Sequence, residues 1–193
     1  MFSFSSPQTI HFGRGQSQQA ATIAKGYGDA ALLVHGANAQ RAEWLVTLCN
    51  DAGLSIKPIS CQNEPSLPDI ERAMAGLQGF RPAVVIGMGG GSVIDLAKAL
   101  AALIPCTGPV QSYLEVVGDG RPLDAPPIPM IALPTTAGTG AEVTKNAVIS
   151  VPEHGLKVSL RDPRMIPQIA IVDADLMQGA PQRVTLAAGL DAV

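Results

Sequence analysis

The feature that most constrains the fold of this chain is a buried strand that leads through glycines into a helix. Residues 83–87 form a continuous apolar run, which is typical of a strand covered on both faces. Three glycines follow at 89–91, and residues 92–104 are almost wholly apolar, which predicts a buried helix. Ser92 and Asp95 have the spacing of a capping box, so we expect the helix to begin at Ser92. Such a junction directs several backbone N–H groups and the positive end of a helix dipole toward one point.

This junction predicts a binding site for a pyrophosphate. Glycine is needed because a Cβ would keep a phosphate away from the backbone, and many such turns require a positive φ. The alternative is a tight glycine turn that binds no ligand. Two common nucleotide motifs do not fit: Ser92 stands where the usual dinucleotide fingerprint has its third glycine, and the chain contains no Gly-Lys-Ser/Thr of a P-loop.

The rest of the chain alternates between short β-rich runs and helical stretches. Strands are expected at residues 30–34, 55–60, 83–87, 130–133 and 169–172, and helices at 39–52, 68–77, 92–104 and 182–193. Residues 144–151 and 156–160 predict an antiparallel hairpin. Repeated strand–helix units predict an α/β fold with a parallel sheet flanked by helices, from which the β-hairpin is an excursion.

A second polar loop follows the predicted strand at 130–133. Residues 134–144 read PTTAGTGAEVT, with four threonines and two glycines. Loops at the carboxyl ends of neighbouring parallel strands lie side by side, where ligands bind. Threonine hydroxyls and bare amides suit a ribose or a phosphate, whereas the alternative is an ordinary capped turn. Two such loops in one α/β pattern favour a dinucleotide site.

Composition narrows the class of protein further. Apolar residues make up 47% of the 193 residues and charged residues 15%, which excludes an intrinsically disordered chain. Lys and Arg number 13 against 16 Asp and Glu, a net charge of −3, so we expect no nucleic-acid partner. Cys49, Cys61 and Cys106 form no CxxC pair, which fits reduced thiols in a cytoplasmic protein and argues against a disulfide framework or a zinc site. Gly, Pro and Gln interrupt the charge-free stretches, so we expect no membrane-spanning helix.

The two loops together resemble motifs of the iron-containing (group III) alcohol dehydrogenase family. The first matches the pattern GGGSxxDxAK at residues 89–98, and the second matches PTTAGTGxEVT at 134–144. Further similarities occur in chain order at residues 12–15 (FGxG), 113–115 (YLE), 172–176 (VDxDL, with Ala174 in place of the family's Pro) and 189–192 (GLDA). The last is similar to the start of a G-[ML]-D-A-x-x-H metal motif. The matches span nearly the whole chain, so the resemblance is specific.

The resemblance implies a two-domain organisation. Family members join an N-terminal dinucleotide-binding α/β domain, Rossmann-like and similar to the N-terminal domain of dehydroquinate synthase, to a C-terminal all-helical domain. We expect residues 1–180 to form the dinucleotide-binding domain and residues 181–193 to begin a truncated helical metal-binding domain, with the rest of the helical domain absent. The implied function is hydride transfer between NAD or NADP and a small alcohol or aldehyde in the full-length parent. On its own, the chain is expected to bind the cofactor and to be inactive.

By resemblance, residues from both loops and from two later positions bind the cofactor. Those that hold the pyrophosphate are Gly89, Gly90, Gly91 and Ser92. Those that line the rest of the site are Asp95, Thr135, Thr136, Thr139, Lys157 and Leu176. Within this set Asp95 orders the glycine loop, Lys157 approaches the ribose region, and Leu176 packs near the adenosine.

One departure from the family concerns the choice between NAD and NADP. At the end of the second strand the family often has an Asp that accepts from the ribose hydroxyls of the adenosine, and here Gly36 stands at that position. A carboxylate would repel a 2′-phosphate, so its absence favours tolerance of, or preference for, NADP(H). Arg41 lies nearby in sequence and can approach such a phosphate if its helix faces the right way.

This sequence matches only one of the four metal ligands of the family. One Asp and three His hold Fe²⁺ or Zn²⁺ in the family, and Asp191 matches the Asp. The three histidines of the chain do not match the ligand positions, so we expect that this chain alone binds no iron tightly.

Other functions on the same architecture stay open. These are a maleylacetate reductase, a glycerol dehydrogenase, a dehydroquinate synthase-like lyase, and a dinucleotide-binding module without catalysis. The threonine-rich string favours the alcohol dehydrogenase branch. Family members are commonly dimers or larger, so the resemblance also admits a homo-oligomer.

Overall fold

A parallel sheet forms the centre of the computed structural model, which describes residues 4–191 and the side chains of residues 4–190. The sheet has six strands in the order β1-β8-β5-β4-β2-β3, and every neighbouring pair is parallel. The strands are β1 (Thr9–Phe12), β2 (Ala30–Gly36), β3 (Ser55–Cys61), β4 (Val84–Gly89), β5 (Met130–Pro134) and β8 (Ile169–Val172). The predicted α/β class with a parallel sheet is confirmed.

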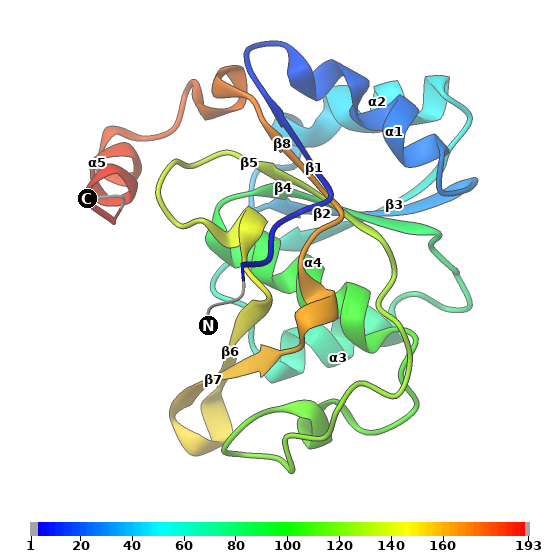
Figure 1. Cartoon of the computed structure of the whole chain (residues 1–193), viewed down its shortest axis with the longest axis vertical. Helices are drawn as coiled ribbons and strands as arrows, with labels where there is room; N and C mark the ends of the chain where they lie inside the picture. The colour runs from blue at the N-terminus through cyan, green and yellow to red at the C-terminus, as the bar shows by residue number, and fades with distance from the viewer. Residues whose placement is uncertain (1–3, 192–193) are drawn as a thin grey trace.

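Helices cover both faces of this sheet (Figure 1). One face carries α1 (Ala20–Lys25) and α2 (Glu43–Asp51), and the other carries α3 (Leu67–Ala75) and α4 (Gly91–Leu103). Successive strand residues point to opposite faces, so Ala31 and Leu33 of β2 belong to the core under α1 and α2. Leu32 and Val34 belong to the core under α3 and α4. This double burial explains why the strands show continuous apolar runs.

The hairpin is confirmed as an excursion from the main sheet. Strands β6 (Asn146–Val151) and β7 (Leu156–Arg161) pair antiparallel in a separate two-stranded sheet. Ala147 and Ile149 of β6 are fully buried in the same core as α4. The hairpin therefore lies against the helix that begins at the glycines.

The start of α4 and the presence of α1 differ from the sequence expectation. Gly90 is the N-cap of α4, which begins at Gly91 without a side-chain cap, so the expected capping box of Ser92 and Asp95 is wrong. A capping box is present instead in α3, between Ser66 and Asp69. Helix α1 was not predicted, because its six residues hold fewer than two helical turns and show little periodicity.

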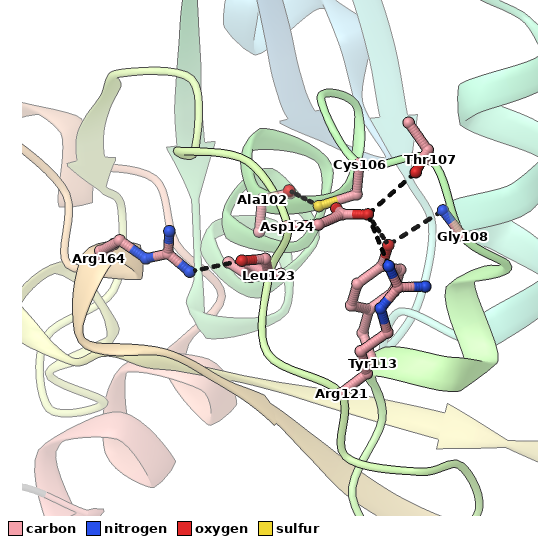
Figure 2. Close-up of polar contacts among 9 residues, drawn as sticks. All are labelled: Ala102, Cys106, Thr107, Gly108, Tyr113, Arg121, Leu123, Asp124 and Arg164. Atoms are coloured by element: carbon pink, nitrogen blue, oxygen red, sulfur yellow. Dashed lines mark hydrogen bonds and ion pairs between the residues drawn. The ribbon is translucent and has the colours of Figure 1, made fainter.

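The long connection from α4 to β5 is held by a polar cluster around Asp124 (Figure 2). The Asp124 carboxylate accepts from the Thr107 hydroxyl (3.0 Å), the Tyr113 hydroxyl (3.0 Å) and the Arg121 guanidinium (3.1 Å). The guanidinium of Arg164 donates to the carbonyl of Leu123 at 2.9 Å and ties this connection to the segment after β7. None of these residues belongs to the predicted site, so the cluster serves the fold.

Helix α5 (Gln182–Asp191) ends the described part of the chain. Figure 1 shows it beyond β8, beside the loop that follows β5. Among the described residues, no helix is both long and apolar enough to cross a membrane.

Candidate functional site

The glycine junction lies at the carboxyl edge of the sheet, where the chain changes direction. Strand β2 leads to α2 on one face, whereas β4 leads to α4 on the other, and the two strands are direct neighbours. On the other side of β4, Gly89 pairs with Pro134 at the end of β5. The ends of three strands therefore converge at a topological switch point, which is where open α/β sheets bind ligands.

Close packing explains the glycines of the junction. A Cβ on Gly89 would lie 2.4 Å from Cγ2 of Val93, so only glycine lets α4 begin this close to β4. Gly90 and Gly91 face the threonine loop, where their Cβ positions would lie 3.4 Å from Thr136 Oγ1 and 3.3 Å from Thr139 Cγ2. The two loops that the sequence singled out are thus in contact.

The start of α4 presents uncapped backbone amides. Gly90, at the N-cap position, carries no side chain, and the 13-residue helix has no acidic residue in its first turn. Gly91 and Ser92 line an open cavity. An uncapped helix N-terminus next to an open space is suited to an anion, because its N–H groups and dipole favour negative charge.

Three adjoining cavities surround this helix start. The glycine cavity (about 850 Å³) extends from the glycines to α5, and its lining residues include Gly90, Gly91, Ser92, Thr136 and Thr139. The β2 cavity (about 360 Å³) lies at the end of β2, and its lining residues include Gly36, Gly89, Gly90, Thr135 and Leu176. The hairpin cavity (about 450 Å³) lies toward β6 and β7, and its lining residues include Gly91, Ser92, Asp95, Thr139 and Lys157. All of the expected cofactor residues line at least one of the three.

Arg41 joins the β2 cavity to the segment after β8. It belongs to a 3₁₀ helix (Ala39–Ala42) that follows β2. Its Nη2 donates to the carbonyls of Leu176 and Gln178, each at 3.3 Å. Arg41 and Gly36 line the same cavity.

Asp95 does not order the glycine loop as expected. Its Oδ2 accepts from the backbone N–H of Val148 in β6 at 3.0 Å. Burial raises the pKa of this carboxyl, whereas the hydrogen bond from Val148 and the charge of Lys98 act in the opposite direction. The carboxylate therefore fixes the hairpin against α4.

Lys98 was quoted in the family pattern but was given no role from the sequence, although it and Asp95 are the two charges of an otherwise apolar helix. Its side chain is 1% exposed. The ammonium donates to Thr144 Oγ1 at 2.7 Å and to the carbonyl of Asn146 at 3.0 Å. Burial lowers the pKa of Lys98 to about 8, against the opposing charges of Asp95 and Glu142. Lys98 links α4 to the end of the threonine loop.

Asp173, which also had no role assigned from the sequence, explains the VDxDL motif at the end of β8. This fully buried carboxylate accepts from the backbone N–H groups of Gly15 (3.1 Å), Ser17 (2.9 Å) and Asp175 (2.9 Å). Burial raises the pKa of Asp173, but these hydrogen bonds outweigh it, and the net pKa is lowered. Asp173 thereby fixes the turn after β1 against the segment that carries Leu176.

The expected metal ligand lies at the edge of the described chain. Asp191 is the last residue of α5, and its side chain lies outside the described residues. Among the described side chains, no group of three or more His, Cys, Asp or Glu is arranged to hold a metal ion.

Comparisons with known proteins connect this arrangement to one family. A family model described as iron-containing alcohol dehydrogenase matches residues 7–174. Long-chain-alcohol dehydrogenase 1 from Geobacillus thermodenitrificans is 42% identical over 130 residues, which cover 67% of this chain and 32% of that protein. NADPH-dependent butanol dehydrogenase from Clostridium saccharobutylicum is 29% identical over 202 residues, which cover 100% of this chain and 50% of that protein.

The fold agrees with solved structures. The crystal structure of sulfoacetaldehyde reductase from Bifidobacterium kashiwanohense in complex with NAD⁺ has a TM-score of 0.84 and 26% identity, and the match covers 99% of this chain and 51% of that one. The chain thus spans about half the length of these proteins or less.

Proposed function

The chain belongs to the iron-containing alcohol dehydrogenase family, and we propose that it binds a nicotinamide dinucleotide across the glycine, β2 and hairpin cavities. It is then the cofactor-binding part of an enzyme that transfers hydride between NAD(P)H and a small alcohol or aldehyde. The observation that carries this proposal is the uncapped start of α4, which opens onto all three cavities through Gly90 and Gly91.

Each cavity takes one part of the dinucleotide in this proposal. The amides of Gly91 and Ser92 hold the pyrophosphate, because no side chain competes for them at the helix start. The adenosine lies in the β2 cavity against Leu176, and the nicotinamide riboside lies toward the hairpin cavity. When bound, the nicotinamide ring would in its reduced form supply a hydride to an aldehyde, or in its oxidised form take one from an alcohol. The chain's own residues bind and orient the dinucleotide.

The chain contains one of the residues that are expected to hold the metal of the family. Asp191 is one oxygen ligand for Fe²⁺ or Zn²⁺, and such an ion acts as a Lewis acid on an alcohol or carbonyl oxygen. One carboxylate does not complete a metal site. Hydride transfer therefore needs donors beyond those that the described residues bring together.

NADP(H) is the preferred cofactor in this proposal. Gly36 puts no carboxylate in the β2 cavity, and the Arg41 guanidinium lines the same cavity. The other charged side chain of that lining, Asp175, is paired with Arg14. A 2′-phosphate thus meets a cation and no free carboxylate among the described lining residues.

The affinities of the chain for NADPH and NADH test both the proposed dinucleotide binding and the proposed preference for NADP(H). Binding of NADPH and NADH to the 193-residue chain is measured by nicotinamide fluorescence. We expect both to bind, with NADPH the tighter. Gly36→Asp should weaken NADPH by about tenfold, because the added carboxylate repels the 2′-phosphate, and leave NADH within about twofold. Arg41→Gln should also weaken NADPH selectively. NADPH that binds tenfold more weakly than NADH contradicts the cofactor preference, and the absence of binding by either contradicts the proposed function.

A further inference from the structure

The end of the threonine loop is fixed to α4 by a buried lysine. Lys98 belongs to α4, and its side chain is 1% exposed. Its ammonium donates to Thr144 Oγ1 at 2.7 Å and to the carbonyl of Asn146, the first residue of β6, at 3.0 Å. At pH 7 the group is charged, because its lowered pKa of about 8 is still above that pH. Both hydrogen bonds are therefore charge-assisted, which makes them stronger than neutral ones.

Hydrogen bonds continue from Thr144 through the loop toward the glycine junction. The Thr144 hydroxyl accepts from Lys98 and donates to the carbonyl of Ala141 at 3.3 Å. Ala141 is buried and begins a 3₁₀ turn (Ala141–Val143). Its N–H donates to Thr139 Oγ1 at 3.4 Å. These contacts link the buried ammonium to the hydroxyl of Thr139.

Thr139 faces the place that the proposed dinucleotide occupies. It is exposed, and it lines both the glycine cavity and the hairpin cavity. A Cβ on Gly91 would lie 3.3 Å from Thr139 Cγ2 and 3.6 Å from its Oγ1, so this side chain lies against the first residue of α4. Lys98, by contrast, is not among the described residues that line the three cavities. An effect of Lys98 on a ligand must therefore pass through other residues or through space.

We propose that Lys98 is a positioning residue for the dinucleotide, because it holds the threonine loop with the Thr139 hydroxyl beside the start of α4. This inference rests on the proposed function. A hydroxyl that is already held in place loses less freedom on binding, and such preorganisation raises affinity. The alternative is attraction of the phosphates through space by the ammonium. The charges of Asp95 and Glu142 lie close enough to act on Lys98 and offset its field.

Substitutions of Lys98 and Thr139, alone and together, test the inference through the affinity of the 193-residue chain for NADPH. Lys98→Met should raise the dissociation constant about fivefold, comparable to the loss of one neutral hydrogen bond. Thr139→Val, which removes the hydroxyl with little change of shape, should also raise it about fivefold. In the Thr139→Val background Lys98→Met should add less than about twofold, because the hydroxyl that Lys98 positions is gone. Losses that multiply to about 25-fold overturn the inference, since independent effects combine in this way.

A matched pair of variants at Thr144 tests the path from Lys98 to the loop. Thr144→Val keeps the volume of the side chain but removes the oxygen that accepts from Lys98, and it should weaken NADPH about fivefold. Thr144→Ser keeps the oxygen and loses a methyl group, and it should stay within about twofold of the wild type. A role in packing alone predicts the reverse order. Equal affinities of the two variants, or a weaker Thr144→Ser, overturn the inference.

The control is Lys145→Met, which removes an exposed charge from the residue after Thr144. It should leave the affinity within about twofold, since an exposed charge is largely screened. Urea unfolding at pH 7 establishes that each variant is folded, and if Lys98→Met is not, the pair at Thr144 decides alone. An unaltered affinity in Lys98→Met overturns the inference, and so does an equal loss in Lys145→Met. Absence of NADPH binding by the wild type overturns the proposed function together with this inference.

Discussion

Replacing Lys98 by methionine tests how the buried ammonium affects stability. Methionine has nearly the length of lysine, so the substitution removes the charge and leaves little cavity. It removes the donor to Thr144 Oγ1 and to the Asn146 carbonyl. It also removes the cost of burying a charge that Asp95 and Glu142 offset only in part.

The size of the effect on the free energy of unfolding follows from the pKa of Lys98. A fall from the ordinary 10.5 to about 8 in the folded protein corresponds to about 3 kcal/mol. Between these values the unfolded chain binds the Lys98 proton more tightly than the folded one, so the free energy of unfolding rises with pH in that window. Below pH 8 the lysine is charged in both states, and the full cost of burial is present. Lys98→Met has no such dependence.

The assay is urea unfolding of both proteins from pH 7 to pH 10.5. At pH 7 we expect Lys98→Met to be as stable as the wild type or more stable by about 1 kcal/mol, since a buried charge replaced by an apolar group is often neutral or stabilising. The difference should move in favour of the wild type by about 1 kcal/mol at pH 9 and about 3 kcal/mol at pH 10.5. Lys145→Met, at an exposed lysine near the same hairpin, is the control. A difference that stays constant across this range refutes the reasoning.

Two further predictions concern residues that fix the shape of the site. Gly89→Ala should lower the free energy of unfolding by about 1–3 kcal/mol through its clash with Val93, whereas Gly36→Ala, with nothing within 4 Å of its Cβ, should stay within about 0.5 kcal/mol. Equal effects in chemical denaturation would show that close packing does not require the glycine. Asp173→Ala should cost about 3 kcal/mol at pH 7, because it leaves the buried N–H of Ser17 and the partly buried N–H groups of Gly15 and Asp175 without their acceptor. The folded-state pKa of Asp173 is lowered, so its contribution is present above the ordinary value near 4 and is lost as pH falls. A cost that is the same at pH 7 and pH 3 would contradict this role.

Local patterns predicted most of the elements because their signals lie within a few residues. The five predicted parallel strands and the hairpin were found at their expected positions, with ends shifted by one or two residues. The same local spacing gave a wrong prediction at the start of α4. Ser66 and Asp69 have the same spacing as Ser92 and Asp95, yet only the first pair forms a capping box. The reason is tertiary, because Val148 takes the Asp95 carboxylate.

The sequence by itself determined the glycine junction, the threonine loop and the family, since each depends on residue types at short spacing. Only the tertiary structure decided which groups the charged side chains pair with. Asp173 meets Ser17 across 156 residues of sequence, and Asp95 meets Val148 across 53. Glu64 and Lys157 likewise come together only because the hairpin folds back onto the loop after β3. Periodicity records which face of an element is buried, but the partner of a polar side chain depends on which elements the fold brings side by side.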